Sequence, residues 1–237
     1  MALTEKQEQF NAAMARFASN RAYTLFGRFI ASANIFLQIY LLFCVWHHSI
    51  GVLGQVFAFM VAYVLADLIN GLVHIYMDNN DRYDSIAGPL VANFHMHHKI
   101  PRYRKNNLAV VYFNETGSKV WLVGYLVAVL VLVEMGLPPV ISYILVYIGI
   151  LSSVAEVSHY LCHTSNAKMS ILLGNMGVLL AKRHHAHHHL ENNVSYAFLN
   201  GFTDQLLNLI AAKFYKGYKQ TTDLHYLNYA VANEDER

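Results

Sequence analysis

Histidines are concentrated in one internal stretch of the chain, residues 182–189, which reads KRHHAHHH. On a helix, His184 and His188 lie one turn apart, as do His185 and His189, so their ring nitrogens can approach a common centre. Taken alone, this stretch could equally be a solvated loop or a pH-sensitive surface patch. Further histidines and carboxylates at helical spacing favour a metal site.

A stripe of polar residues interrupts an apolar segment near residue 70. Asp67, the adjacent pair Asn70 and Gly71, His74 and Asp78 are separated by three or four residues, which places them on one face of a helix. Ionisable groups inside a membrane are expensive and usually functional. The stripe therefore predicts part of a metal site, and a structural hydrogen-bonded network is the alternative.

Two more histidine groups follow. Segment 94–98 reads FHMHH and could be a plain surface patch. His159 and His163 form an i,i+4 pair that can bind one metal from one helical face. Glu156 precedes His159 by one turn and could accept a proton from its far ring nitrogen. A core histidine is the alternative for either residue singly, but the pair beside an acidic residue favours ligation.

Eight imidazoles are therefore predicted as metal ligands: His74, His97, His98, His159, His163, His185, His188 and His189. Additional ligands or their hydrogen-bonding supports are predicted at Asp67, Asp78, Glu156 and His184, with His95 and His187 in reserve. A closed zinc site uses four ligands and a catalytic one three, so eight suffice for two ions. Imidazole also suits copper, iron and nickel. Two histidine-rich ions at the mouth of an apolar bundle favour iron that activates O2, because no side chain supplies an oxidant for an unactivated C–H bond.

The composition indicates a membrane protein. Hydrophobic residues make up 55% of the chain and charged residues 14%, against about 25% charged in soluble domains. Four apolar runs approach the roughly 20 residues needed to cross a bilayer: Leu25–Trp46, Val52–Val73, Val120–Met135 and Pro139–Val157. The third is short, with Lys119 able to extend toward water at its end. The predicted fold is all-α, a bundle of about four transmembrane helices with a histidine-rich cap and interfacial helices.

The basic residues predict an orientation. None of the 17 Lys and Arg residues lies in the two connections His47–Gly51 and Glu134–Pro138. By the positive-inside rule, both termini, the 75–118 loop and the chain after His159 face the cytoplasm of a bacterial inner membrane or of the endoplasmic reticulum. This places His47 and His48 on the opposite face from the other groups, and His225 is interpreted as incidental.

The remaining segments predict a single domain over residues 1–237. Residues 1–21 lack a signal peptide and suggest a short helix on the membrane, with Phe10, Met14 and Phe17 inward. Met169–Leu180 and Phe198–Phe214 are predicted as interfacial helices. Residues 216–237 are predicted as a polar tail, with Asn233–Arg237 disordered.

The same residues resemble the Kua-type lipid desaturases, a family that contains animal plasmanylethanolamine desaturase, its bacterial counterparts and a plant plastid phosphatidylglycerol desaturase. The pattern D-x-x-x-G-L-V-H-x-x-x-D is met at residues 67–78, F-x-x-H-H-x-x-P at 94–101 and F-x-E-T at 113–116. H-x-x-x-H falls on His159 and His163, and H-H-x-x-H-H falls on residues 184–189, followed by Tyr196 and Gly201. Gly117 and Asn192-Asn193 depart from the family pattern.

The resemblance implies a membrane di-iron oxidoreductase that removes two hydrogens from a lipid alkyl or acyl chain. It implies O2 as the oxidant and an electron donor such as cytochrome b5 or ferredoxin, with no nucleic acid involved. In plasmalogen-forming members the product is a vinyl ether. The alternatives are a lipid hydroxylase with the same histidine boxes and a zinc-dependent membrane hydrolase, which needs only about three histidines. A metal transporter or sensor should instead carry ligands midway across several crossings.

Overall fold

The computed structural model of the 237-residue chain describes residues 4–99 and 106–229. Within these ranges every regular element is a helix, which confirms the predicted all-α fold. The elements are α1 (Glu5–Ser19), α2 (Arg21–Trp46), α3 (Gly51–Asp78), α4 (Gly88–Lys99), α5 (Leu108–Thr116), α6 (Val120–Glu134), α7 (Pro139–Thr164), α8 (Lys168–Asn175), α9 (Lys182–Leu190), α10 (Asp204–Phe214), the 3₁₀ turn η1 (Tyr218–Gln220) and α11 (Thr222–Leu227). The family-motif residue Pro101 and the tail Asn233–Arg237 lie outside the described residues.

Three helices, α2, α3 and α7, are long and apolar enough to cross a membrane. The predicted crossing Val120–Met135 differs from them. Helix α6 has only 15 residues, about 22 Å of helix, and it reaches the length of a span only together with α5, from which it is bent by 88°. Within the described part of the chain, three helices could therefore cross a membrane, or four if the bent pair forms one crossing.

The directions of α3 and α7 indicate whether the bent pair α5 and α6 forms a crossing. His74 near the end of α3 and His159 near the end of α7 both lie against the ring of Phe198, with ring centroids 4.3 and 4.1 Å apart from it. Both helices therefore finish on the same side of the bundle. The chain between them must return to the other side before α7 begins, so we expect α5 and α6 to supply this fourth, bent crossing.

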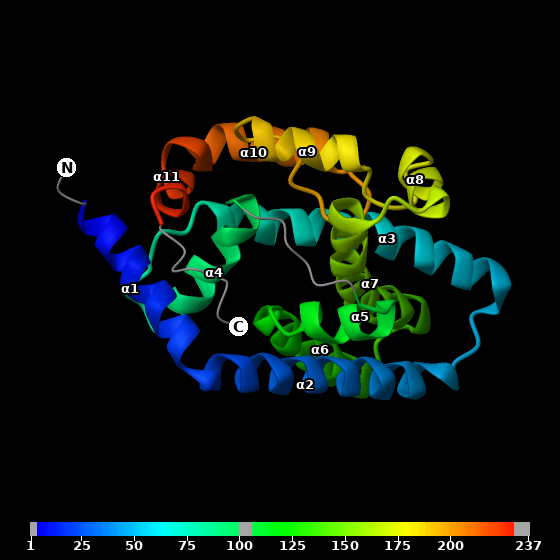
Figure 1. Ribbon diagram of the computed structural model, residues 1–237. Helices are drawn as coiled ribbons and strands as arrows, with labels where there is room; N and C mark the ends of the chain where they lie inside the picture. The colour runs from blue at the N-terminus through cyan, green and yellow to red at the C-terminus, as the bar shows by residue number, and fades with distance from the viewer. Residues whose placement is uncertain (1–3, 100–105, 230–237) are drawn as a thin grey trace.

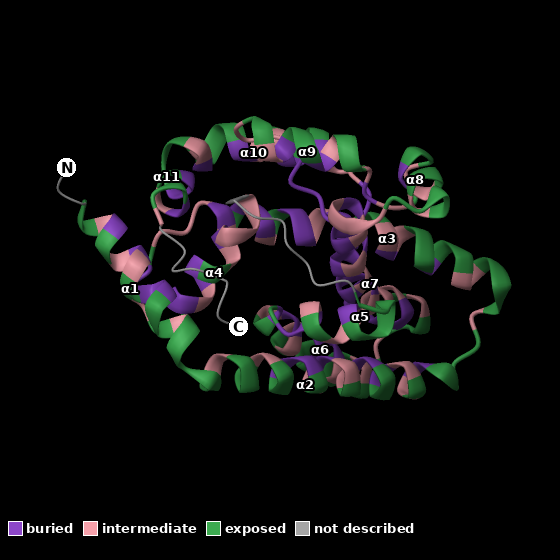
Figure 2. Cartoon of the chain, in the orientation of Figure 1, coloured by how far each residue is buried: buried purple, intermediate pink, exposed green. Residues whose placement is uncertain are grey.

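Helix α7 forms the centre of the molecule. Figure 1 shows α2 along one side, α9 and α10 along the opposite side, and α7 between them, and Figure 2 shows α7 as largely buried. Small residues let neighbouring helices approach α7 closely: Ala62 and Ala66 of α3 are fully buried against it. At Gly149 an added Cβ would lie 2.5 Å from Leu126 Cδ2, so α6 packs directly on the α7 backbone.

Lys119, between α5 and α6, takes part in a buried polar network inside the apolar core. The sequence predicts that Lys119 lies at a membrane edge with its amine extending toward water. In the structure the side chain is buried instead, at 4% exposure. Its Nζ lies 2.8 Å from Glu156 Oε1 and donates to Asn70 Oδ1 at 2.5 Å. The sharp bend before α6 directs the amine inward, where a carboxylate on α7 balances its charge.

The N-terminal helix forms, but the packing predicted for it is wrong. Phe10 and Met14 of α1 are buried against protein, in a cluster with Tyr83, Val91 and Tyr226, and not against lipid. Thr4 caps the helix by accepting a hydrogen bond from the amide of Gln7. This packing ties α1 to α4 and α11.

The two predicted interfacial helices are only partly as expected. Helix α8 occupies part of Met169–Leu180 and exposes apolar side chains. In the second segment, α10 begins at Asp204, and residues 198–203 form a loop instead of a helix, buried at 198–200 and exposed at Phe202. Gly201 in this loop has φ +93°, a left-handed conformation that ends any continuous helix.

Candidate metal centre

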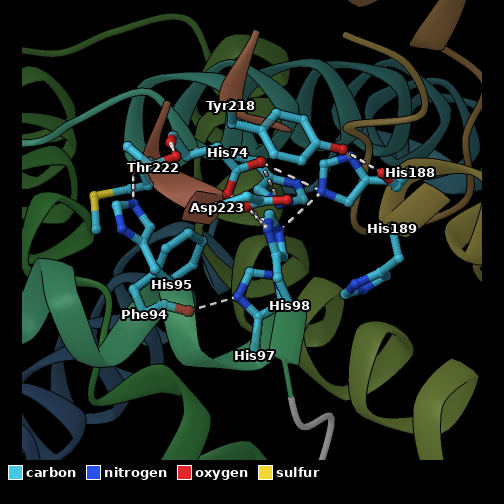
Figure 3. A network of polar contacts seen from close by, with 12 residues as sticks. His74, Phe94, His95, His97, His98, His188, His189, Tyr218, Thr222 and Asp223 are labelled. Atoms are coloured by element: carbon cyan, nitrogen blue, oxygen red, sulfur yellow. Dashed lines mark hydrogen bonds and ion pairs between the residues drawn. The ribbon is translucent and has the colours of Figure 1, made fainter. Parts of the chain in front are cut away.

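Four histidines and one aspartate from three helices converge on one point. His74, Asp78, His97, His98 and His188 each present one ligand atom, and these atoms all lie within 4.8 Å of one another. Helix α3 supplies the first two, α4 the next two and α9 the last. His98 Nε2 and His188 Nε2 are 3.2 Å apart, and Figure 3 shows their rings meeting beside Tyr218 and Asp223.

The opposite ring nitrogens of these histidines are held by acceptors. His74 Nδ1 donates to the carbonyl oxygen of Tyr196 at 2.8 Å. In the same way, His97 Nδ1 donates to the carbonyl of Phe94 at 2.6 Å, and His188 Nδ1 donates to the carbonyl of Val194 at 3.0 Å. A carbonyl oxygen only accepts, so in the neutral ring Nδ1 carries the proton and Nε2 keeps a lone pair. Each Nε2 that points into the cluster is therefore a ready metal ligand.

Asp78 makes this cluster electrostatically incomplete without a cation. Both carboxylate oxygens are buried and accept no hydrogen bond, although His74 Nε2 and His188 Nε2 lie 3.2 and 3.3 Å from Oδ2. Those nitrogens present lone pairs, so they cannot donate to the carboxylate. An unpaired buried carboxylate costs several kcal/mol. The donor set thus fits a bound metal ion, which supplies the missing positive charge.

A second group of imidazoles adjoins the first. The ligand atoms of His159, His163 and His185 also lie within 4.8 Å of one another. His159 Nε2 is 2.9 Å from His185 Nε2 and 3.1 Å from His163 Nε2. Two nitrogens bound at about 2.1 Å to one ion and at a right angle are about 3.0 Å apart. The spacing in this group therefore matches neighbouring ligands of one metal.

His189 lies between the two groups. Its Nε2 is 2.9 Å from His185 Nε2, and its ring centroid is 5.1 Å from that of His163 and 5.0 Å from that of His98. All eight histidines predicted as ligands are therefore brought together, and Asp78 joins the first group.

Burial keeps the imidazoles of α4 and α9 neutral. Desolvation, followed by the charges of neighbouring histidines, holds the pKa of His97 and His98 well below the usual value. Burial likewise lowers the pKa of His188 to about 4 and that of His189 to about 3. Neutral imidazole is the form that ligates a metal.

Asp67, predicted as a further ligand or support, anchors a loop and contacts no histidine group. Its Oδ1 accepts hydrogen bonds from the amides of residues 199, 200 and 201, and its Oδ2 accepts from the amide and hydroxyl of Thr203. These bonds hold residues 198–203, and with them Phe198, against His74 and His159.

The other predicted supports are occupied elsewhere. Glu156 pairs with Lys119, and His184 pairs with Asp204, which also accepts from the amide of Ala197. His95 is buried away from both groups, with Nε2 donating to Met77 O and Nδ1 accepting from Tyr83 Oη. The exposed His187 pairs with Glu191.

The sequence interpretation missed the contribution of the C-terminal segment. Residues 216–237 are predicted as a polar tail, but η1 and α11 lie against the first histidine group. Asp223 Oδ1 lies 2.8 Å from His98 Nδ1, Tyr218 Oη lies 3.2 Å from His188 Nδ1, and Thr222 Oγ1 donates to Asp78 O. Apart from the four-residue spacing of Tyr218 and Thr222, these residues follow no repeated pattern, and none of them is among the predicted site residues.

The histidines expected to lie apart do so. His47 follows α2 and His48 lies in the connection to α3, and neither belongs to a histidine group. His225 also stays outside both groups, but it is not incidental, because its Nδ1 lies 3.0 Å from Tyr83 Oη and its ring packs near Phe10.

Comparison with known proteins agrees with the geometry. No curated protein and no solved structure matches the chain. The family model described as the lipid desaturase domain matches residues 63–221, about two thirds of the chain, a range that contains both histidine groups and ends before Asp223. The chain therefore belongs to the Kua-type lipid desaturase family, whose members are oxidoreductases of membrane lipids.

Proposed function

We propose that the protein is an O2-dependent, di-iron desaturase that introduces a double bond into the alkyl or acyl chain of a membrane lipid. The observation that carries this proposal is Asp78, whose buried carboxylate has no hydrogen-bond donor and faces imidazole lone pairs, a setting that suits a bound cation. The second imidazole group beside it supports a second ion. Membership of the lipid desaturase family supports the reaction class.

The two groups would hold the ions separately. His74, Asp78, His97, His98 and His188 would hold one, and His159, His163 and His185, joined by His189, would hold the other. Ligand type alone allows zinc or iron. Two adjacent histidine-rich positions favour iron over the single zinc of a hydrolase, because a catalytic zinc uses about three protein ligands and would leave one group unexplained.

When bound, the iron pair supplies the oxidising chemistry with O2 that breaks unactivated C–H bonds. The overall reaction is R–CH2–CH2–R′ + O2 + 2 e⁻ + 2 H⁺ → R–CH=CH–R′ + 2 H2O, with the electrons supplied by a one-electron donor such as a cytochrome b5-like or ferredoxin-like protein.

The side chains position the ligands and exclude water. The carbonyls of Tyr196, Phe94 and Val194 fix the orientation of three ligand rings. Phe198 stacks on His159 with an interplanar angle of 17° and covers the junction between the two groups on the bundle side. Because Phe198 is buried, its ring helps to keep water away from both groups.

The finer assignment is to plasmalogen formation, with the vinyl ether at the sn-1 chain as the product. The family resemblance supports it. We also propose that the histidine groups and both termini face the cytoplasm, since the basic residues are absent from the connection between α2 and α3 and from the one before α7.

Lipid mass spectrometry of cells with and without the gene tests this function. The expected result is one lipid class that loses two hydrogens only when the gene is present. A gain of one oxygen would assign the site to hydroxylation instead, and an unchanged lipid profile in cells with an active electron donor would refute both.

A further inference from the structure

A cavity of about 240 Å³ lies between the end of α7, helix α8 and the beginning of α9. Leu161, Ile171, Leu179 and Leu180 give it apolar walls, and Lys182 and Arg183 lie on its lining where α9 begins. Neither histidine group uses this cavity.

The cavity adjoins the second histidine group through the chain. Cys162, in its wall, is the neighbour of His163 on α7. Lys182 and Arg183 precede His185 on α9 by three and two residues. Residues that line the cavity therefore lie within one helical turn of proposed metal ligands on two helices.

The outer wall of the cavity is apolar and exposed. Helix α8 and the residues that follow expose a set of large apolar side chains, which Figure 2 shows as a mostly exposed helix: Met169, Ile171, Leu172, Met176 and Val178. Apolar patches of this kind on a membrane protein lie in the bilayer boundary. A lipid can therefore reach the cavity without crossing water.

The rim carries unbalanced positive charge. Lys182 and Arg183 are exposed, and no carboxylate pairs with either among residues 4–99 and 106–229. Lys182 Nζ donates to the neutral Asn166 Oδ1 at 2.6 Å. Other exposed lysines, such as Lys213 and Lys216, also have no carboxylate partner among the described residues, but they do not line the cavity. A planar guanidinium beside an ammonium matches the oxygens of a phosphate group.

We propose that this cavity is the headgroup subsite for a glycerophospholipid, with the phosphate on Lys182 and Arg183 and the first part of a chain against the leucines. This inference rests on the proposed lipid desaturase function and adds to it the residues that select a phosphate-bearing lipid. Charge complementarity favours the phosphodiester, and the apolar part of the wall suits the first part of a chain.

Binding, measured without turnover, tests the subsite. Purified metal-loaded protein in detergent is titrated with dioleoylphosphatidylethanolamine, with dioleoylglycerol, which has the same chains and no phosphate, and with oleate, and bound lipid is counted by native mass spectrometry. The wild type is expected to bind the phospholipid at least about tenfold more tightly than either other lipid.

Variants locate the binding. Lys182→Ala/Arg183→Ala should abolish the preference for phosphate while metal content stays at the wild-type level, and Lys182→Gln and Arg183→Gln should each weaken it. Ile171→Trp, which fills the cavity, should weaken phospholipid and dioleoylglycerol alike. The charge-matched control Lys213→Ala/Lys216→Ala, on and just after α10, should keep the preference.

Three results would overturn the subsite: no preference in the wild type, a preference that survives in Lys182→Ala/Arg183→Ala, or oleate binding as tightly as the phospholipid. This binding test does not depend on the proposed reaction, because a protein that forms no unsaturated product can still prefer the phospholipid. Conversely, loss of the subsite leaves the metal assignment intact.

Discussion

The Nδ1 atom of His98 lies 2.8 Å from Oδ1 of Asp223, and the two side chains are 1% and 2% exposed. Asp223 belongs to α11, beyond the residues that the family model matches. A carboxylate in this position fixes the ring orientation of a ligating histidine and raises its basicity. Helix α11 therefore takes part in building the first histidine group.

Asp223→Asn is expected to lower the affinity for the metal bound by the first group about 10- to 100-fold, because the amide keeps the shape but not the charge that orients His98. Competition with a chelator measures this affinity. Asp81→Asn, which removes a half-exposed carboxylate paired with Lys6, is the matched control and should change nothing. Equal affinities in the two variants would contradict the role of Asp223.

Asp67→Ala should destabilise the fold by about 3 kcal/mol or more, since the hydrogen bonds that the carboxylate accepts from residues 199–203 are lost in a buried site. The melting temperature in detergent is expected to fall by roughly 10 °C. The exposed Asp84→Ala serves as control and should melt with the wild type. An Asp67→Ala protein as stable as this control would show that another contact holds the loop.

Gly88→Ala should destabilise the protein, whereas Gly124→Ala should not. A Cβ at residue 88 would lie 1.9 Å from the backbone oxygen of Tyr83, so the turn that precedes α4 must open and displace His97 and His98. A Cβ at Gly124 of α6 meets nothing within 4 Å. Thermal melting and metal content should both fall only in Gly88→Ala, and equal effects in the two variants would disprove the close approach.

His95 predicts a pH dependence of stability. Burial lowers its pKa to about 4, against about 6.5 in an unfolded chain. Between these values the unfolded state binds a proton that the folded state excludes. The stability contributed by neutral His95 is therefore complete above about pH 6.5 and is lost as the pH falls toward 4.

The corresponding variant is His95→Gln, whose amide can still donate to Met77 O. Melting temperatures measured between pH 7.5 and 5 should fall less steeply in His95→Gln than in the wild type. Parallel curves would show that His95 does not titrate on unfolding in this range.

Spacing along the chain was enough to predict which histidines come together. His74 and Asp78, His159 and His163, and His185 and His189 are i,i+4 pairs, and helical geometry alone places each pair on one face. The all-α fold and the membrane helices α2, α3 and α7 follow equally from apolar runs. Local periodicity carries this information because it does not depend on which helices pack together.

Contacts between distant segments were not predictable in this way. The pairing of Lys119 with Glu156 depends on an 88° bend between α5 and α6, and apolar composition does not signal a bend. Asp223 is an isolated acid in a polar segment, and Phe10 packs on Tyr83, 73 residues away. Each of these contacts depends on tertiary packing between segments that are distant in the sequence. Such packing leaves no periodic pattern in the residues near either partner.

The central claim is that two neighbouring histidine groups each hold an iron ion, and the metal content of purified protein tests it most directly. Wild-type chain should contain two iron ions, and His188→Ala and His163→Ala should each lose one, together with the lipid product, while staying in the membrane. His225→Ala should keep both ions, with only a modest loss of stability from its contact with Tyr83. A single zinc in the wild type, or two irons and product in both ligand variants, would contradict the account.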